Sequence, residues 1–279
     1  MLQITKVSGV WKSLTYNLSF RDILPRRNPT LPYACDASPD IVSQAGPNLK
    51  NSLQYMYRTN GEYSNDRFNP TEGLDSFLKV ELAGPPGDTG FLKLEGGYAF
   101  HMPLFSKPVT VDVGQKQTKH GLTLHASLNG GIMKTLNFGG LCHNTSLVPD
   151  RFFAGGPLQL RGFQPSGIGP RAKCGGKSVA GGDSLGGEVY YATNLTASIP
   201  SPIFSDSGLR LFGFVNAGTL NNYGVPLQAF VRSSRISVGG GASLGSPLGR
   251  VELTYAVPIR YGPKDARKSV QLGFGLCFN

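Results

Sequence analysis

The sequence is poor in charge, in cysteine and in long apolar runs. Charged side chains make up 16% of its 279 residues, against about 25% in a typical soluble domain. No stretch of about 18 or more apolar residues is present, which excludes an ordinary transmembrane helix. The four cysteines have no metal-like spacing and do not form a disulfide scaffold pattern. The first residues show no basic segment followed by an apolar core, so no signal peptide is expected.

The sequence also lacks working versions of the common catalytic motifs. Two serine motifs, at 182–185 and 241–245, match hydrolase signatures in their letters. Hydrolases of both kinds need a histidine that follows the serine, whereas every histidine here precedes both motifs: His101, His120, His125 and His143. No complete Gly-x-x-x-x-Gly-Lys-Ser/Thr phosphate loop is present, and the histidines have no metal-ligand spacing. We therefore expect no enzyme, no cofactor and no metal.

Glycine and positive charge are what the chain has in excess. It contains 38 glycines, roughly twice the usual share of about 7%. Lys and Arg total 27 and Asp and Glu 17, which gives a net charge of +10. A basic lumen or a basic rim facing anionic lipid explains this excess as well as polyanion binding does. The basic residues of the predicted loops form no stripe with stacking aromatics, so no nucleic-acid partner is expected.

Hydrophobic residues alternate with polar or small residues along most of the chain. Between residues 251 and 260, every odd-numbered residue is apolar and most even-numbered ones are polar or small. A period of two places alternate side chains on opposite faces of a β-strand. Ten such segments are predicted, near residues 7–21, 47–59, 73–84, 89–104, 120–134, 186–200, 208–219, 232–246, 248–261 and 268–278.

The predicted strands are longer than those of soluble proteins. Most run for 11 to 15 residues, against roughly 5–6 in soluble sheets and about 9–11 in a tilted membrane strand. A soluble β-sandwich also alternates, but its strands are shorter and its sheets pack face to face. Without an apolar helix, only a β-barrel satisfies a lipid-exposed backbone. The pattern predicts an all-β fold, an antiparallel transmembrane β-barrel of about ten strands with a polar lumen and an apolar outer band.

Two long loops interrupt the strands, at 22–46 and at about 135–185. The second contains residues 150–163, which read DRFFAGGPLQLRGF. This segment resembles the long loop motif of the outer-membrane barrel-assembly superfamily, also called the bacterial surface antigen family. The motif has an aromatic stretch, a Gly-Gly pair, and then a hydrophobic residue followed by Arg-Gly-Phe or Arg-Gly-Tyr.

Further matches to this family follow in the same order along the chain. Residues 185–191, 212–218 and 243–253 resemble its next strands, and a terminal strand closes on Phe278. The resemblance is good over 148–279 and rests mainly on strand pattern before that. Within the superfamily, the central barrel of the mitochondrial sorting and assembly machinery is the most similar branch. A chloroplast outer-envelope relative is the alternative.

The resemblance implies the insertion of β-barrel precursor proteins into the mitochondrial outer membrane, by strand templating at a lateral seam. An incoming strand brings unpaired N–H and C=O groups into lipid, where each costs several kcal/mol. A seam that opens offers a strand edge that pairs them by β-augmentation. The implied partners are β-barrel precursors, other subunits of the sorting and assembly complex, and membrane lipids. A passive outer-membrane pore or channel is the alternative function.

The resemblance also implies two groups of functional residues. The loop tip is expected in the lumen, through Leu160, Arg161, Gly162 and Phe163. The family often has an aspartate where this sequence has Asn216, so Glu188 becomes the nearest acid and the expected partner of Arg161. The last strand fits the precursor signal of the family's substrates and is expected to line the seam, through Gln271, Gly273, Leu276 and Phe278.

The strand count is low for this family. Five predicted strands follow the long loop, as in the family, and five precede it. The chain is therefore expected to hold about ten of the family's sixteen strands, as a single barrel-type domain over residues 1–279 with its internal loop at 135–185. The family's N-terminal polypeptide-transport-associated domain and early strands are expected to be absent. Whether ten strands close on themselves stays open.

Overall fold

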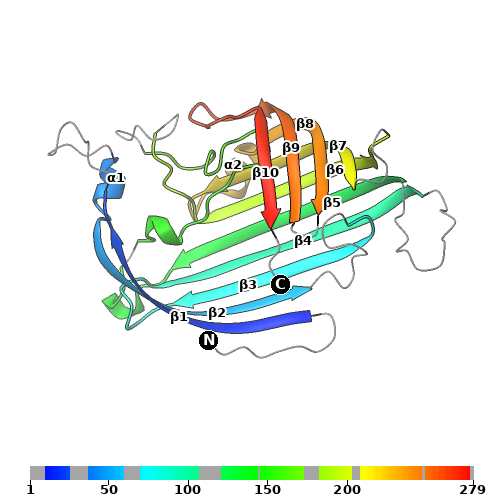
Figure 1. Ribbon diagram of the computed structural model, residues 1–279. Helices are drawn as coiled ribbons and strands as arrows, with labels where there is room; N and C mark the ends of the chain where they lie inside the picture. Colours follow the sequence, from blue (N-terminus) through cyan, green and yellow to red (C-terminus); the bar gives the residue numbers. More distant parts are fainter. Residues whose placement is uncertain are drawn as a thin grey trace.

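The protein forms one antiparallel β-sheet, with a long loop folded onto one of its faces (Figure 1). The computed structural model describes residues 10–25, 37–59, 70–106, 121–143, 145–172, 182–202, 208–246 and 249–276. These residues include two short α-helices, α1 Pro39–Val42 and α2 Leu227–Arg232, and two short 3-10 helices, η1 Phe138–Gly140 and η2 Val148–Asp150. Within the described ranges, none of these helices has the length and apolar character that a membrane span requires.

Ten strands lie where the alternation predicts them. They are β1 Val10–Ile23, β2 Gly46–Thr59, β3 Gly73–Ala83, β4 Phe91–Ser106, β5 Gly121–Thr135, β6 Val189–Pro200, β7 Leu209–Asn221, β8 Arg235–Ser246, β9 Gly249–Arg260 and β10 Val270–Leu276. Each overlaps one predicted segment, with ends that differ by a few residues. The predicted all-β, antiparallel architecture is confirmed.

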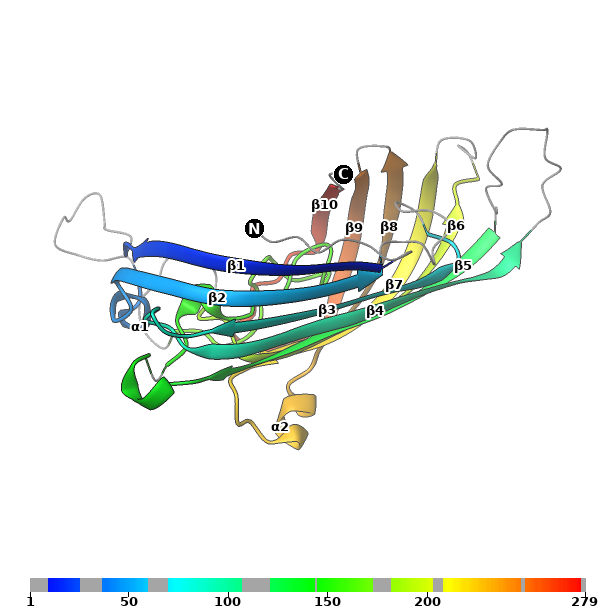
Figure 2. The same ribbon diagram turned by 90° about the horizontal axis from the view of Figure 1, so that it is seen from below.

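The strands pair in the order of the sequence, from β1 through to β10. Among the described strands, β1 pairs only with β2 and β10 only with β9, so the sheet is open between two edges. Figures 1 and 2 show that the sheet curves strongly, with β6–β10 turned up from β1–β5. The side toward which it curves is the concave face, and it holds the loop that joins β5 to β6.

The two faces of the sheet differ in chemistry as the period of two predicts. On β9, Leu253, Tyr255 and Val257 point to the convex face and are 54%, 59% and 47% exposed. The residues between them, Thr254 and Ala256, are buried on the concave face. The convex face therefore presents an apolar band to its surroundings. The concave face is covered by the loop between β5 and β6.

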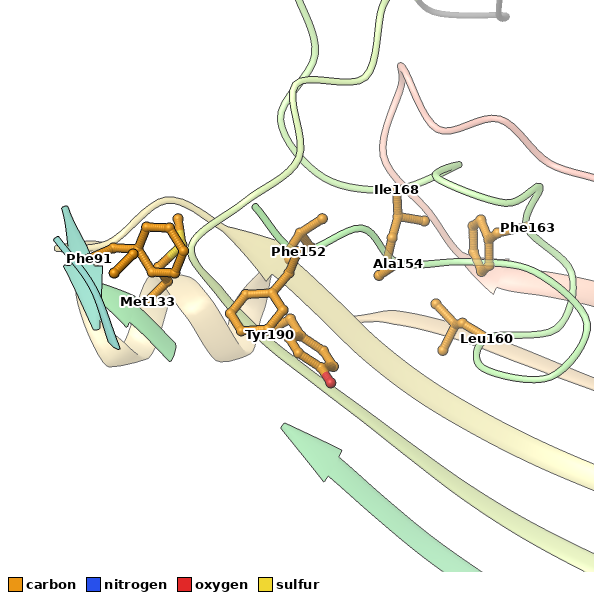
Figure 3. Close-up of a cluster of buried hydrophobic side chains, with 10 residues drawn as sticks. Phe91, Met133, Phe152, Ala154, Leu160, Phe163, Ile168 and Tyr190 are labelled. Atoms are coloured by element: carbon orange, nitrogen blue, oxygen red, sulfur yellow. The ribbon is translucent and has the colours of Figure 1, made fainter. Parts of the chain in front are cut away.

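The main apolar core lies between the concave face and the loop (Figure 3). It is formed by Ala83, Phe91, Met133, Phe152, Ala154, Leu160, Phe163, Ile168, Tyr190 and Leu220. Half of these residues belong to the loop and half to the strands or their ends. The Phe152 and Tyr190 rings are 4.7 Å apart between centroids. Burial of these side chains, at about 1.5–3 kcal/mol for each large one, holds the loop inside the curve of the sheet.

Two glycines of β8 make room for aromatic rings of the neighbouring strand. A Cβ on Gly239 would lie 2.0 Å from the Tyr255 carbonyl oxygen and 3.0 Å from the Phe214 ring. A Cβ on Gly241 would meet the Phe212 ring in the same way, at 3.0 Å. The strands can therefore approach closely here, and both rings lie across the concave face.

Replacing Gly239 with alanine should destabilise the sheet, because the new methyl group overlaps the backbone of β9. We expect Gly239→Ala to lower the free energy of unfolding by about 1–3 kcal/mol, the range for an overpacked core. Urea unfolding of the protein in detergent micelles measures this. Gly213→Ala is the matched control, since its Cβ would have only a carbonyl oxygen 3.9 Å away. Equal unfolding midpoints for the two variants would contradict the close packing at Gly239.

Candidate functional site

The loop between β5 and β6 folds back on itself as an irregular hairpin on the concave face (Figure 3). Two isolated antiparallel bridges join its two arms, Phe152–Gly187 and Ala154–Ile168, and a third, Arg171–Ser184, closes a turn within the returning arm. Its tip closes where the Gly156 N–H donates to the Phe163 carbonyl at 3.0 Å. This geometry carries the predicted Leu-Arg-Gly-Phe tetrapeptide to the last five strands.

Arg161 lies at the centre of the tip and is nearly fully buried. One guanidinium nitrogen donates to Glu252 Oε2 on β9 at 2.7 Å, and the other terminal nitrogen donates to Asn194 Oδ1 on β6 at 3.2 Å. The guanidinium carbon lies 4.9 Å from the Phe214 ring centroid and 5.3 Å from that of Phe212. A buried arginine needs this combination of a carboxylate, further acceptors and aromatic faces to offset its desolvation.

The carboxylate that neutralises Arg161 is shared with a second arginine. Glu252 is 2% exposed, and its Oε1 lies 2.7 Å from Nε of Arg250. Two guanidinium groups therefore meet one carboxylate on the inner side of β9. Removing Glu252 would leave two buried guanidinium groups without a carboxylate, whereas removing one arginine would leave Glu252 paired with the other.

The expected pairing of Arg161 with Glu188 is wrong. Glu188 accepts hydrogen bonds from the Ser146 hydroxyl at 2.6 Å and the Tyr223 N–H at 2.9 Å. It precedes β6, six residues before Asn194, and six strand residues span about 20 Å. Glu188 thus belongs to the base of the loop, whereas Arg161 reaches the middle of the strands.

At the loop base, Glu188 also acts electrostatically on Arg151. Burial lowers the pKa of the Arg151 guanidinium, and the nearby Glu188 carboxylate opposes that shift. Arg151 donates to the Ser146 hydroxyl and carbonyl oxygens, both at 2.8 Å. These bonds fix where the loop leaves the sheet.

Asn216 does contact the tip, but through the backbone of Arg161 rather than its charge. In the amide orientation that satisfies its neighbours, the Asn216 oxygen accepts from the Arg161 N–H at 2.7 Å and its nitrogen donates to Ser237 Oγ. The Ser237 hydroxyl also donates to the Arg161 carbonyl at 2.5 Å. Both polar groups of the Arg161 peptide are therefore held by β7 and β8.

Gly162 permits the turn that follows Arg161. Its φ is +89°, a left-handed conformation that glycine adopts without strain. A Cβ here would lie 3.2 Å from Ser237 and 3.3 Å from Ala256 on the wall. On either side, Leu160 and Phe163 are 1% and 0% exposed. The four predicted loop residues thus lie buried against the concave face.

Gln271 of β10 binds the same turn from the last strand. Its Oε1 accepts from the Gly162 N–H at 2.8 Å, and its Nε2 donates to the Phe163 carbonyl at 2.7 Å. Gln271 is 3% exposed, so its amide replaces hydration for both backbone groups. The last strand is therefore attached to the loop tip by a side chain that the sequence singled out for another role.

Of the other predicted residues of the last strand, Gly273 and Leu276 lie in β10. Gly273 faces the loop, where a Cβ would lie 3.1 Å from Pro157 and 3.3 Å from Leu158. Leu276 ends β10. Phe278 lies outside the described residues.

Sequence reasoning missed Glu252 as the partner of Arg161 and Gln271 as a ligand of the loop. A signal was present for Glu252, because it is the acidic residue among the even-numbered, inward positions of residues 251–260. An acid on the concave side of the predicted strand is a candidate counter-ion for an arginine placed there. No local pattern indicated that Gln271 would face the loop tip.

A second polar cluster crosses the concave face on β4–β6. His101 Nδ1 and His125 Nδ1 are 2.8 Å apart, and His125 Nε2 lies 2.8 Å from Ser198 Oγ. Ser198 is 4% exposed and its hydroxyl also accepts from Arg210 Nε at 3.2 Å. The cluster joins neighbouring strands through these side-chain hydrogen bonds.

Ser243, the serine of one hydrolase-like motif, lies within β8 and is 2% exposed. It is therefore not presented on the strand-to-helix turn that such hydrolases need.

Comparison with known proteins finds one matching family model and several similar sequences. The model of the Omp85 superfamily domain matches residues 10–278. A SAM50-like protein of Schizosaccharomyces pombe is 33% identical over 256 residues, covering 87% of this chain and 47% of that protein. The sorting and assembly machinery component 50 homolog of Homo sapiens is 31% identical over 256 residues, covering 87% and 48%. The chain spans about half the length of the curated relatives it matches.

A solved structure has the same fold. The crystal structure of BamA from Haemophilus ducreyi lacking POTRA domains 1–3 superimposes with a TM-score of 0.66 at 21% sequence identity. The match covers 94% of this chain and 50% of that one. The ten-stranded sheet is thus similar to about half of that structure.

Replacing Arg161 with alanine should release the loop tip from the wall. Glu252 would keep Arg250 as its counter-ion, and the tip would lose its charge-assisted hydrogen bond to Glu252, worth about 1.5–3 kcal/mol. We expect faster amide hydrogen exchange over residues 154–167 and a lower unfolding midpoint, with Arg161→Lys in between because lysine keeps the charge alone. Arg232→Ala, on the exposed face of α2, is the control. Unchanged exchange in Arg161→Ala would show that the tip is held without the guanidinium.

Proposed function

Because the chain belongs to the Omp85 superfamily, we propose that it takes part in inserting and assembling β-barrel precursor proteins in the mitochondrial outer membrane. The names of its relatives, sorting and assembly machinery components, support this activity. The mechanism is strand templating at a lateral seam. Leu160, Arg161, Gly162 and Phe163 act as the inner anchor of the last strand. Gln271, Gly273, Leu276 and Phe278 line the seam.

The observation that carries the proposal is the state of β10. Its inner side is held by the loop through Gln271, while β9 is its only partner among the described strands. An edge strand presents a row of N–H and C=O groups that another chain can pair. In lipid each unpaired group costs several kcal/mol, so an incoming strand gains by adding to this edge. The anchor keeps the template in position while its edge is used.

The convex face supports a location in the bilayer. Its exposed side chains on the last strands are apolar or aromatic, as on Leu253, Tyr255, Leu272 and Phe274. Burying about 30 Å² of such surface in hydrocarbon is worth roughly 0.8 kcal/mol, so lipid acyl chains are the partner this face fits. We propose an integral protein of the mitochondrial outer membrane, with the chloroplast outer envelope as the alternative.

The proposed partners follow from the same activity. They are β-barrel precursors at the seam, membrane lipids on the convex face, and other subunits of the sorting and assembly complex. The proposal assigns the chain no catalytic step and no cofactor, because strand exchange needs no covalent chemistry.

A passive pore is the second candidate, because the concave face carries polar residues such as Thr254, Glu252 and Asn216. The loop argues against it, since its tip is packed on these residues and would obstruct a channel. Planar bilayer recordings separate the two functions. Stable open levels indicate a pore, and flickering levels indicate a barrel obstructed by its loop.

Precursor strands should contact the β10 edge and no central strand. In a background without the native cysteines, we expect Leu272→Cys to form a disulfide with a precursor that carries one cysteine in its terminal strand. The reason is that, among the described strands, β10 pairs on one side only whereas β5 pairs on both. Membranes that carry the full chain are given the precursor, and crosslinked product is followed on gels.

The matched control is Leu128→Cys on β5, which is equally exposed on the convex face, at 54% against 53% for Leu272. Exposure to lipid is thus the same in both variants, and only the availability of a strand edge differs. Similar crosslink yields at the two positions would rule out templating on β10.

A further inference from the structure

Asp150, at the end of η2, has a carboxylate that is bound by cations from two strands. Arg21 of β1 donates to both of its oxygens, at 2.8 and 3.1 Å, and Lys50 of β2 lies 3.2 Å away. The Asp150 side chain is 1% exposed. Charge-assisted bonds of this kind, one of them bidentate, are among the strongest polar contacts in proteins.

The surroundings of Asp150 extend this anchor to further strands. The Lys93 ammonium of β4 donates to the Asp150 carbonyl at 2.7 Å and lies 4.3 Å from the Phe152 ring centroid. Lys50 also pairs with Glu81 of β3 at 2.7 Å. Three strands, β1, β2 and β4, therefore bind the loop at this one residue, and β3 is joined to them through Lys50.

The segment before Asp150 is tied to the same side of the sheet. The Val148 N–H donates to Gln44 Oε1 at 2.8 Å, in the connection that joins β1 to β2. Farther along the loop, Asp183 accepts from the Ser38 N–H at 2.7 Å. The β1–β2 hairpin is thus bound to the loop through its connection as well as its strands.

The two anchors of the loop lie on opposite halves of the open sheet. Asp150 is bound by β1, β2 and β4, whereas Arg161 is bound by β6 and β9 and the next residue by β10. Figure 1 places β1 and β10 at the two edges of the sheet, with the loop between them. The ten residues between the anchors, 151–160, include the buried Phe152, Ala154 and Leu160, so this segment is packed against its surroundings rather than slack.

We propose that the loop is a tie across the concave face and that Asp150 is its second anchor, a positioning residue that limits how far the β1–β2 edge and the β10 edge can move apart. The first anchor is Arg161. With both in place, the curvature of the sheet is fixed from inside. The consequence for precursor insertion rests on the proposed function, because the tie then sets the geometry in which the β10 edge meets a strand.

Spin labels on the two edges measure the tie directly. Leu53 on β2 and Leu272 on β10 are both exposed on the convex face, at 45% and 53%, and accept a label without entering the loop. In the full chain in lipid, with native cysteines replaced by serine, the distance between labels should have one narrow distribution. Asp150→Asn removes the charge and keeps the size, so Arg21 and Lys50 lose their counter-ion on the loop. We expect a broader distribution shifted to longer distances.

Three further variants complete the test. Asp22→Asn, an exposed carboxylate beside Arg21 on β1, should leave the distribution narrow. Asp150→Glu keeps the charge and should restore most of the narrow distribution. If Asp150→Asn does not fold, Arg21→Gln removes one cation and leaves Lys50 and Lys93 in place, and it should widen the distribution as well. A folded Asp150→Asn or Arg21→Gln protein with the parent distribution would overturn the tie.

The test of the tie and the test of the proposed function can fail independently. The label distances are measured without any precursor, and precursor insertion is measured on the parent chain. A parent that inserts nothing, combined with a widened Asp150→Asn sheet, would reject the insertion role and keep the tie. A parent that inserts precursors, combined with an unchanged Asp150→Asn sheet, would reject the tie and keep the insertion role.

Discussion

The ion pair between Arg161 and Glu252 is the contact on which the arrangement of the loop and the last strands depends. Both side chains are almost fully buried, and charges removed from water are stable only where partners offset the lost hydration. Glu252, Asn194 and the Phe212 and Phe214 rings do this for the Arg161 guanidinium, while Ser237 and Gln271 bind the backbone of the tip. Every one of the last five strands therefore contacts the tip. The strands must therefore be in register before the loop tip can bind.

Most of the fold could be predicted from the sequence because it depends on a local pattern. Alternation along residues such as 251–260 fixes which side chain faces which side, and a strand of this length needs no distant information to be recognised. The loop tip was predictable through its Arg-Gly-Phe motif. The partner of Arg161 was not, since Glu188 is near it in sequence while Glu252 is near it in space. That choice depends on how far the loop enters the curve of the sheet, which no local pattern encodes.

Asp150 shows the same limit from the other half of the sheet. In the sequence it is only the first residue of the loop motif at 150–163, and nothing near it indicates Arg21 or Lys50 as partners. These contacts join segments 129 and 100 residues apart. The last strand combines the two cases: Gln271 and Gly273 fit the pattern that predicts a role at the seam, and Gln271 also binds the loop tip. One strand can serve both purposes, since its inward side chains face the loop while the N–H and C=O groups on the side away from β9 stay open to another strand.

The loop contacts also constrain the order in which the chain can fold. The bonds from Asp150 to Arg21, from Arg161 to Glu252 and from Gly162 to Gln271 close sequence separations of 129, 91 and 109 residues. Hairpins between neighbouring strands close far shorter loops and form sooner, because closure entropy and contact order both favour local pairing. The Asp150 anchor needs only β1, β2 and β4, whereas the tip is bound completely only once β10 has paired with β9, because Gln271 is one of its ligands. Slow amide exchange at the tip therefore reports that the last strand has joined the sheet, while slow exchange near Asp150 does not.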